Sequence, residues 1–223
     1  MLNSHAHIDF SSVKPYKNSD VCIVPSIGKQ NWQKVTNYKL YAYGIHPWYI
    51  DKHTSEDLAL LEDNIRKNSP IAIGECGLDF KIYSNKTEQK LFFEEQLKLA
   101  RKFKLPVIIH SVKATEEVIL TLKKYPTLRG EIHGFSGSES QAKSLINMGF
   151  LLGFGLQITN INSTKLRSLI NNIPIESILI ETDDHYNPND IQLVVDTIAQ
   201  LKQLTLEKTI QICDNNTISL FNL

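Results

Sequence analysis

Two histidines one residue apart, His5 and His7, lie within the apolar run Leu2–Ile8. Alternate residues of a β-strand face the same side, so a strand here would direct both imidazoles toward one point, within reach of a single ion. Burying two imidazoles in such a run is costly without a partner, and a cation is a suitable partner. Either histidine alone could be a core residue with satisfied hydrogen bonds. The pair predicts a metal site, with Asp9 close by.

Glu75 follows the apolar run Ile71–Gly74, where an isolated carboxylate would lose its hydration. A cation beside it would offset that cost, and an ion pair with a lysine or arginine is the alternative. The two carboxylate oxygens could join two ions, which two-metal hydrolases hold about 3.5–4 Å apart. Glu75 is therefore predicted to be both a metal ligand and a catalytic residue.

Three more groups of the metal-binding kind, His110, His133 and Asp183, stand at or just beyond the ends of short apolar runs. In a barrel of parallel strands these ends meet at the face where active sites form. We expect His110 and His133 to bind a second ion, and Asp183 to bind the first ion and to accept a proton from its water. Each histidine alone could be structural, and Asp183 with Asp184 could form a solvated turn. Together the imidazoles and carboxylates fit one or two divalent ions, Mg²⁺, Mn²⁺ or Zn²⁺.

The elements that must position these groups are short apolar runs that alternate with longer amphipathic segments. The runs predicted as buried parallel strands are Leu2–Ile8, Val21–Ile27, Leu40–Ile45, Ile71–Gly74, Pro106–Ile109, Gly130–His133, Phe150–Phe154 and Ile178–Ile180. The segments predicted as helices are Thr54–Lys67, Thr87–Phe103, Ala114–Lys124, Glu139–Met148, Ser163–Ile170, Asn189–Leu201 and Leu206–Phe221.

This alternation predicts an α/β fold, a compact (β/α)8 TIM-type barrel with a missing or shortened first helix, in a single domain over residues 1–223. The alternative is an open, doubly wound sheet. Its nucleotide-binding version has no support, because the sequence contains neither a GxGxxG fingerprint nor a P-loop motif.

Composition limits the classes of function. Basic and acidic residues balance at 24 each, so no overall basic field attracts nucleic acid. This argues against a non-specific DNA coat, but not against an enzyme that meets phosphates through a metal. Three widely separated cysteines indicate neither a disulfide framework nor a zinc knuckle. No signal peptide and no apolar run of membrane-spanning length are apparent, which predicts a soluble protein of a reducing compartment, the cytoplasm.

An ordered series of motifs runs nearly from end to end of the chain. It consists of Ser4-His5-Ala6-His7-Ile8-Asp9, Gly44-Ile45-His46-Pro47, Gly74-Glu75-Cys76-Gly77-Leu78-Asp79-Phe80, residues 89–100, Pro106-Val107-Ile108-Ile109-His110, His133-Gly134-Phe135-Ser136-Gly137-Ser138, Glu181-Thr182-Asp183 and residues 216–221. In this series the chain resembles the TatD-like metal-dependent hydrolases, within the amidohydrolase-type barrels.

The resemblance implies a barrel with a one- or two-metal site. One ion would be held by His5, His7, Glu75 and Asp183, and the other by Glu75, His110 and His133. It also implies a deoxyribonuclease of the 3′–5′ exonuclease type, whose partner is DNA at 3′ ends or as single strands. Two alternatives remain: a hydrolase of a small ester, amide or phosphoester with the same fold, and a TatD-like subunit of a multi-protein complex such as an anti-phage defence system.

The chain departs from the family pattern in loops that would meet substrate. Lys81 lies where the family usually has an arginine, and it could contact phosphate as a point charge. His185 lies after Asp184, where the family usually has proline, and is either a phosphate contact or acid, or a surface loop residue. His46 is a further candidate phosphate contact, or a residue that fixes its loop. Trp48 and the adjacent tyrosine could stack on a base or simply pack at the rim.

Overall fold

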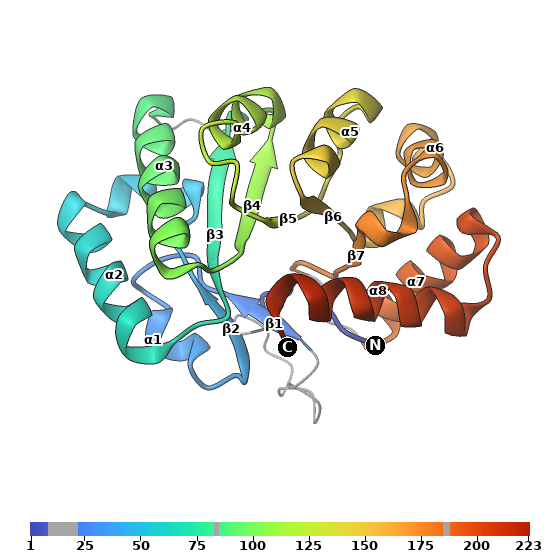
Figure 1. Cartoon of the computed structure of the whole chain (residues 1–223), viewed down its shortest axis with the longest axis horizontal. Helices are drawn as coiled ribbons and strands as arrows, with labels where there is room; N and C mark the ends of the chain where they lie inside the picture. Colours follow the sequence, from blue (N-terminus) through green and yellow to red (C-terminus); the bar gives the residue numbers. More distant parts are fainter. Residues whose placement is uncertain (9–21, 83–84, 185–187) are drawn as a thin grey trace.

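The computed structural model describes residues 1–8, 22–82, 85–184 and 188–223. Its centre is a curled sheet of seven parallel strands in sequence order, with the helices around its outside (Figure 1). The strands are β1 (Ile23–Pro25), β2 (Leu40–Tyr43), β3 (Ala72–Asp79), β4 (Val107–Val112), β5 (Gly130–Ile132), β6 (Phe150–Phe154) and β7 (Ile178–Ile180). A doubly wound sheet would reverse its strand order, so the predicted barrel-type fold is confirmed.

The segment 1–8 lies between the two edges of this sheet. It forms isolated parallel bridges, Asn3 with Cys22 and Ala6 with Asp183. Its backbone also donates from Ser4 N to Ile180 O over 2.9 Å and from Ala6 N to Ile23 O over 3.1 Å. The predicted strand over Leu2–Ile8 is thus reduced to two bridges, but it occupies the predicted place between β1 and β7. The shortened helix expected next falls on residues 9–21, outside the described residues.

Seven of the described helices agree with the predicted segments to within a few residues, and the short helix α1 was not predicted. The described helices are α1 (Trp32–Val35), α2 (Ser55–Asn68), α3 (Lys86–Phe103), α4 (Thr115–Leu122), α5 (Glu139–Asn147), α6 (Thr164–Asn172), α7 (Pro188–Lys202) and α8 (Leu206–Phe221), with 3-10 turns at η2 (Pro47–Lys52), η3 (Leu156–Ile158) and η4 (Ile175–Ser177). Local signals set their starts: Thr54 with Asp57, and Ser138 with Gln141, form capping boxes that satisfy the first free amides of α2 and α5.

Helix α3 fixes the ends of two strands through two glutamines with no exposed surface. The amide of Gln96 accepts from Ile45 N over 2.8 Å and donates to Ile45 O over 3.0 Å, just beyond β2. The amide of Gln89 accepts from Asp79 N over 2.8 Å and donates to Asp79 O over 2.9 Å, at the end of β3. Both backbone segments are therefore held in place by hydrogen bonds inside the core.

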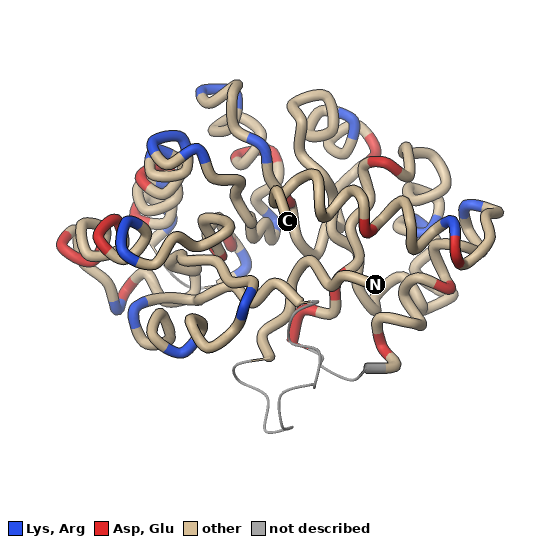
Figure 2. Tube along the Cα trace, turned by 60° about the horizontal axis from the view of Figure 1, so that its bottom comes forward, with Lys and Arg blue, Asp and Glu red and all other residues tan. Residues whose placement is uncertain are grey.

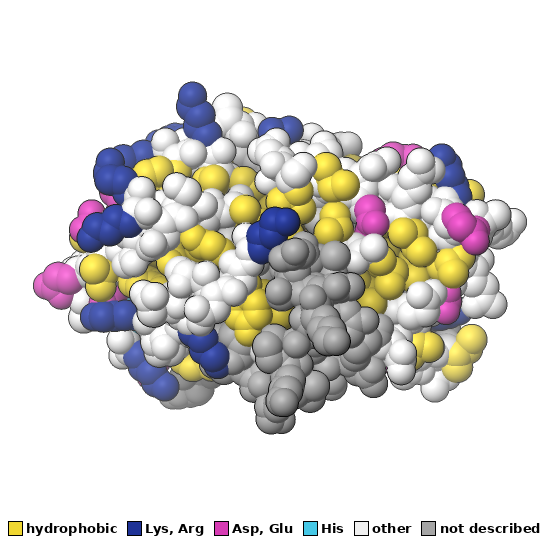
Figure 3. Space-filling model, turned by 90° about the horizontal axis from the view of Figure 1, so that it is seen from below, with side chains coloured by type: hydrophobic (Ala, Val, Ile, Leu, Met, Phe, Trp, Pro, Cys, Tyr) yellow, Lys and Arg dark blue, Asp and Glu magenta, His cyan; other side chains and the backbone are white. Residues whose placement is uncertain are grey.

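Residues of both charge signs are distributed along the described chain (Figure 2). From below, hydrophobic side chains lie among charged side chains and among the backbone and other side chains drawn in white (Figure 3). None of the described helices is both long and apolar enough to cross a membrane. The three cysteines are buried and unpaired.

The packing of α3 against the sheet gives a stability test. Leu97 is 0% exposed and Leu91, on the same helix, is 55% exposed. We expect Leu97→Ala to lower the free energy of unfolding by about 2–5 kcal/mol, because it leaves a cavity in the core. The matched change Leu91→Ala should alter it by less than about 0.5 kcal/mol. Urea denaturation measures both, and equal losses would contradict this packing.

Candidate metal centre

Glu75 lies at the centre of the site because of an irregularity in β3. From Ile73 to Cys76 the strand advances three residues, while β4 advances two, from Val107 to Ile109. The extra residue is a β-bulge, a device that re-aims a side chain. Gly44 allows the neighbouring strand to come close, since a Cβ there would lie 2.5 Å from Glu75 O.

The prediction that Glu75 ends its strand is wrong, because β3 continues to Asp79.

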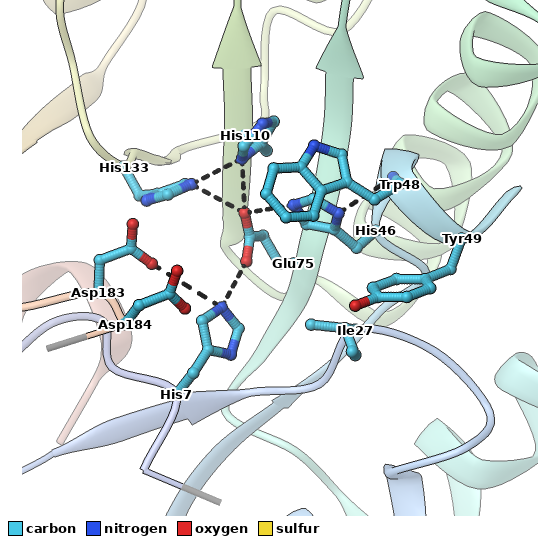
Figure 4. A pocket seen from close by; sticks show the side chains of 10 residues that line it. All are labelled: His7, Ile27, His46, Trp48, Tyr49, Glu75, His110, His133, Asp183 and Asp184. Carbon is cyan, nitrogen blue, oxygen red and sulfur yellow. Dashed lines mark hydrogen bonds and ion pairs between the residues drawn. The ribbon is translucent and has the colours of Figure 1, made fainter. Parts of the chain in front are cut away.

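The two carboxylate oxygens of Glu75 face different histidines (Figure 4). Oε2 lies 3.0 Å from His7 Nε2 and 3.4 Å from His5 Nε2. Oε1 lies 2.8 Å from His133 Nε2 and 2.9 Å from His110 Nδ1. The structure thus brings these four histidines together around the carboxylate of Glu75, which is only 1% exposed.

Asp183 completes the first of these groups. Its Oδ1 lies 3.5 Å from His5 Nε2 and 4.0 Å from His7 Nε2. The backbone joins the same residues, because His7 N donates to Asp183 O and Asp183 N donates to His5 O, each over 3.0 Å. Burial would raise the pKa of Asp183, but hydrogen bonding to His5 and the charges of His133 and His5 hold it below its ordinary value. All six predicted metal ligands therefore lie in one cluster.

His46, predicted as a substrate contact, lies inside this cluster and is oriented by the backbone. Its Nδ1 accepts from Trp48 N over 3.1 Å, and its Nε2 lies 3.1 Å from Glu75 Oε1. Burial lowers the pKa of His46, so the ring is neutral and its proton is on Nε2. His46 lies close enough to Glu75 and His110 to form a group of three possible metal ligands. Its two nitrogens are used otherwise, however: Nε2 donates to Glu75 and Nδ1 accepts from Trp48 N.

The other two predicted substrate contacts are not brought into the cluster. Lys81 is exposed and does not line the pocket over the site. Its backbone N instead donates to Asp79 Oδ1 over 2.8 Å. His185 lies outside the described residues. Both roles stay predictions.

The chemistry of the cluster fits a divalent ion. Its atoms are imidazole nitrogens and carboxylate oxygens, several of them within 4.8 Å of one another in groups of three, a donor set suited to such ions. Burial lowers the pKa of His133 to about 4, which leaves its nitrogen lone pair available. Burial acts in the same direction on His110, but hydrogen bonds to Asp79 and Glu75 raise its pKa to about 9, so a cation would compete with a proton there.

Beneath the cluster lie two buried carboxyls that were not predicted to act together, Glu131 and Glu181. Ser4 Oγ donates to Glu131 Oε1 over 2.5 Å, and Gly134 N donates to Glu181 Oε1 over 2.8 Å. A Cβ at Gly153 would lie within 2.6 Å of an oxygen of each glutamate, so this glycine leaves room for the pair. Burial raises the pKa of both carboxyls. The signal in the sequence was Glu131 in an otherwise apolar run, two residues before His133.

This carboxyl pair predicts a pH dependence of stability. Because folding raises the pKa of Glu131 above its ordinary 4.5, the folded state binds protons more tightly than the unfolded chain. The contribution of this carboxyl to the free energy of unfolding is therefore fully present below about pH 4.5 and is lost as the pH rises through its raised pKa. We expect Glu131→Gln to reduce this fall, measured as the free energy of unfolding of metal-free protein between about pH 4 and about pH 8.

The matched control is Asp63→Asn, which changes an exposed carboxyl of α2. It should leave the pH profile as in the unsubstituted protein. A Glu131→Gln profile identical to that of the control would contradict the buried pair.

A pocket of about 330 Å³ opens over the cluster. Its lining residues are His7, Ile27, His46, Trp48, Tyr49, Glu75, His110, His133, Asp183 and Asp184. His7, His133 and the two aspartates lie on one side of Glu75, and Ile27, Trp48 and Tyr49 lie on the other side together with His46 (Figure 4). No lysine or arginine is found among these described lining residues.

Comparison with known proteins places this chain in a family. The family model for TatD related DNase matches residues 4–222. The chain is 31% identical over 253 residues to the uncharacterized metal-dependent hydrolase YjjV of Escherichia coli K12, covering 100% of this chain and 98% of the relative. The crystal structure of YjjV superposes with a TM-score of 0.89 at 29% identity, over 100% of this chain and 98% of that one. A 3′-5′ ssDNA/RNA exonuclease TatD of Edwardsiella piscicida is 30% identical over 199 residues, covering 81% and 76% of the two chains.

The chain therefore belongs to the TatD related DNase family, as its motifs predicted.

Proposed function

We propose that the protein is a divalent-metal-dependent hydrolase of phosphodiester bonds in DNA, acting at 3′ ends or on single strands. The observation that carries this proposal is the division of ligand atoms around Glu75. One oxygen faces His5 and His7, with Asp183 beside them, and the other faces His110 and His133. The names of the relatives, a metal-dependent hydrolase and a 3′-5′ ssDNA/RNA exonuclease, support the same reaction class.

In this proposal the six ligands predicted from the sequence hold one or two ions, Mg²⁺, Mn²⁺ or Zn²⁺. Bound there, such ions would lower the pKa of a water and stabilise the charge that develops on the phosphate. Asp183 is the residue we assign to accept the proton of the attacking water. Its side chain is 43% exposed to the pocket side, and its lowered pKa keeps it ionised at neutral pH.

The remaining lining residues have separate tasks. His46 holds Glu75 by a hydrogen bond to Oε1. Trp48 and Tyr49 offer an apolar wall on which a base of an unpaired strand could stack. Because the described lining residues include no lysine or arginine, the charge of a bound phosphate would be balanced mainly by the ions. Lys81 remains a candidate contact for a phosphate outside the pocket, and His185 remains a predicted phosphate contact.

A second candidate is hydrolysis of a small ester, amide or phosphoester. The pocket volume of about 330 Å³ and the absence of cationic side chains among its described lining residues favour it, because ligand sites of this size suit small molecules.

The metal assignment is tested with Glu75→Gln, which keeps the shape of the side chain and removes its charge. We expect hydrolysis to fall by more than about 100-fold while the protein remains folded, since both groups of ligands lose their shared carboxylate. Chelation should abolish the activity of the unsubstituted protein, and Mg²⁺, Mn²⁺ or Zn²⁺ should restore it. Full activity of the Glu75→Gln variant after chelation would contradict the metal mechanism.

The substrate class is tested with a panel of end-labelled single-stranded DNA, duplex DNA, RNA, and small esters, amides and phosphoesters. We expect stepwise loss of nucleotides from the 3′ end of single-stranded DNA, because an unpaired base can reach the wall of Trp48. Turnover of the small substrates alone would favour the second candidate, and release of label from the 5′ end first would contradict the expected polarity.

A further inference from the structure

Asp79, at the end of β3, is a buried carboxylate that neither the predicted ligand set nor the proposed mechanism uses. It is only 2% exposed. Its Oδ2 accepts from the indole Nε1 of Trp48 over 2.6 Å and lies 3.3 Å from His110 Nε2. Its Oδ1 accepts from Lys81 N over 2.8 Å. One oxygen thus contacts both the aromatic rim and the metal centre, and the other holds the turn after the strand.

The contact with Asp79 determines which nitrogen of His110 faces the centre. A carboxylate oxygen is an acceptor only, so the ring nitrogen beside it carries the proton. The other nitrogen, Nδ1, lies 2.9 Å from Glu75 Oε1 and 3.0 Å from His133 Nε2. With Nε2 held by Asp79, Nδ1 is the nitrogen that faces Glu75 and His133, so a cation bound there would replace the proton on Nδ1. A carboxylate behind a ligating histidine is a common way to fix its tautomer and orientation.

The same carboxylate fixes Trp48, whose ring is half-exposed at the pocket. The ring is edge-on to His110, with centroids 6.2 Å apart and an interplanar angle of 74°. Trp48 is also held at its backbone, where its N–H donates to His46 Nδ1. Two hydrogen bonds thus tie this rim residue to two histidines of the centre, one through Asp79 and one directly.

Asp79 itself has little freedom to move. Its backbone N–H and C=O both bond to the buried amide of Gln89 in α3. A displacement of His110 would therefore be transmitted to Trp48 through the shared oxygen rather than absorbed by the strand.

We propose that Asp79 is a positioning residue that joins Trp48 to His110, so that binding of an ion by His110 and His133 and the orientation of the aromatic rim are linked. This inference rests on the metal centre of the proposed function. It goes beyond that function by assigning a role to Asp79 and by making the wall that would receive a base depend on the ion beside it.

The test is Asp79→Asn. Asparagine keeps an oxygen for Lys81 N and so preserves the turn, but it places an amide N–H group opposite two N–H donors. We expect one of two bound Zn²⁺ ions to be held about 10–100-fold more weakly and the other to be unchanged, measured by zinc titration against a chromophoric chelator. The matched variant Trp48→Phe keeps a ring and leaves Asp79 beside His110, so both zinc affinities should stay near their original values.

The second readout is tryptophan fluorescence. We expect zinc to change the emission of the unsubstituted protein, and Trp48→Phe to remove that change, which assigns it to Trp48. In Asp79→Asn the emission should no longer respond to the weaker zinc site. Neither readout requires turnover.

The outcomes separate the two proposals. Two zinc ions bound by Asp79→Asn with their original affinities, or a purely lowered unfolding temperature without a change in zinc binding, would overturn the positioning role and leave the metal centre standing. Failure of the unsubstituted protein to bind zinc, manganese or magnesium would overturn the metal centre and this inference together.

Discussion

A carboxylate taken out of water must be balanced by positive charge or by donors, and in this protein that constraint falls on Glu75. Its side chain is almost fully buried, and the five imidazoles of His5, His7, His46, His110 and His133 surround it within 3.4 Å. Four of these rings, those of His5, His7, His110 and His133, turn a nitrogen toward the carboxylate of Glu75, where a cation would take the place of any proton they carry. The fifth, His46, is turned by a backbone amide so that it donates a proton instead. Desolvation of one carboxylate thus explains why so many ligand-type side chains converge here.

The architecture provides the means of this convergence. Parallel strands deliver their side chains to one face, but regular alternation alone would not aim Glu75 between two groups of histidines. The bulge after Ile73 and the close approach at Gly44 do so. The group formed by His5, His7 and Asp183 is complete only where residues 1–8 pair with Asp183, between the first and last strands of the sheet. Catalytic geometry therefore depends on two departures from an ideal barrel, an inserted residue and a closing segment held by isolated bridges.

Much of this could be predicted from the sequence, because periodicity and local signals determine it. The runs Phe150–Phe154 and Ile178–Ile180 are strands with the predicted bounds, and the seven predicted helices differ from prediction by only a few residues. His5, His7, Glu75, His110, His133 and Asp183 could be selected because each is a polar ligand type beside apolar residues.

The residues that escaped prediction act through distant partners. Asp79 works through Trp48 and His110, and Glu131 works through Ser4 and Gly153. No pattern along the chain encodes the direction of such hydrogen bonds. The same holds for His46, whose tautomer is set by the amide of Trp48. The segment Leu2–Ile8 was predicted as a full strand from its apolar character, but its β-bridges are isolated ones at Asn3 and Ala6.

The closing segment has a consequence for how the fold assembles. His5 and Asp183 are among the most distant pairs in the sequence that touch in the folded protein, and contacts of such separation carry a large loop-closure entropy and form late. A nascent or locally opened chain would keep His110 of β4 and His133, just after β5, near Glu75 while lacking the complete other group of ligands. An ion that binds His5, His7 and Asp183 would act as a reversible cross-link between the two edges of the sheet, favouring the closed ring in proportion to its affinity.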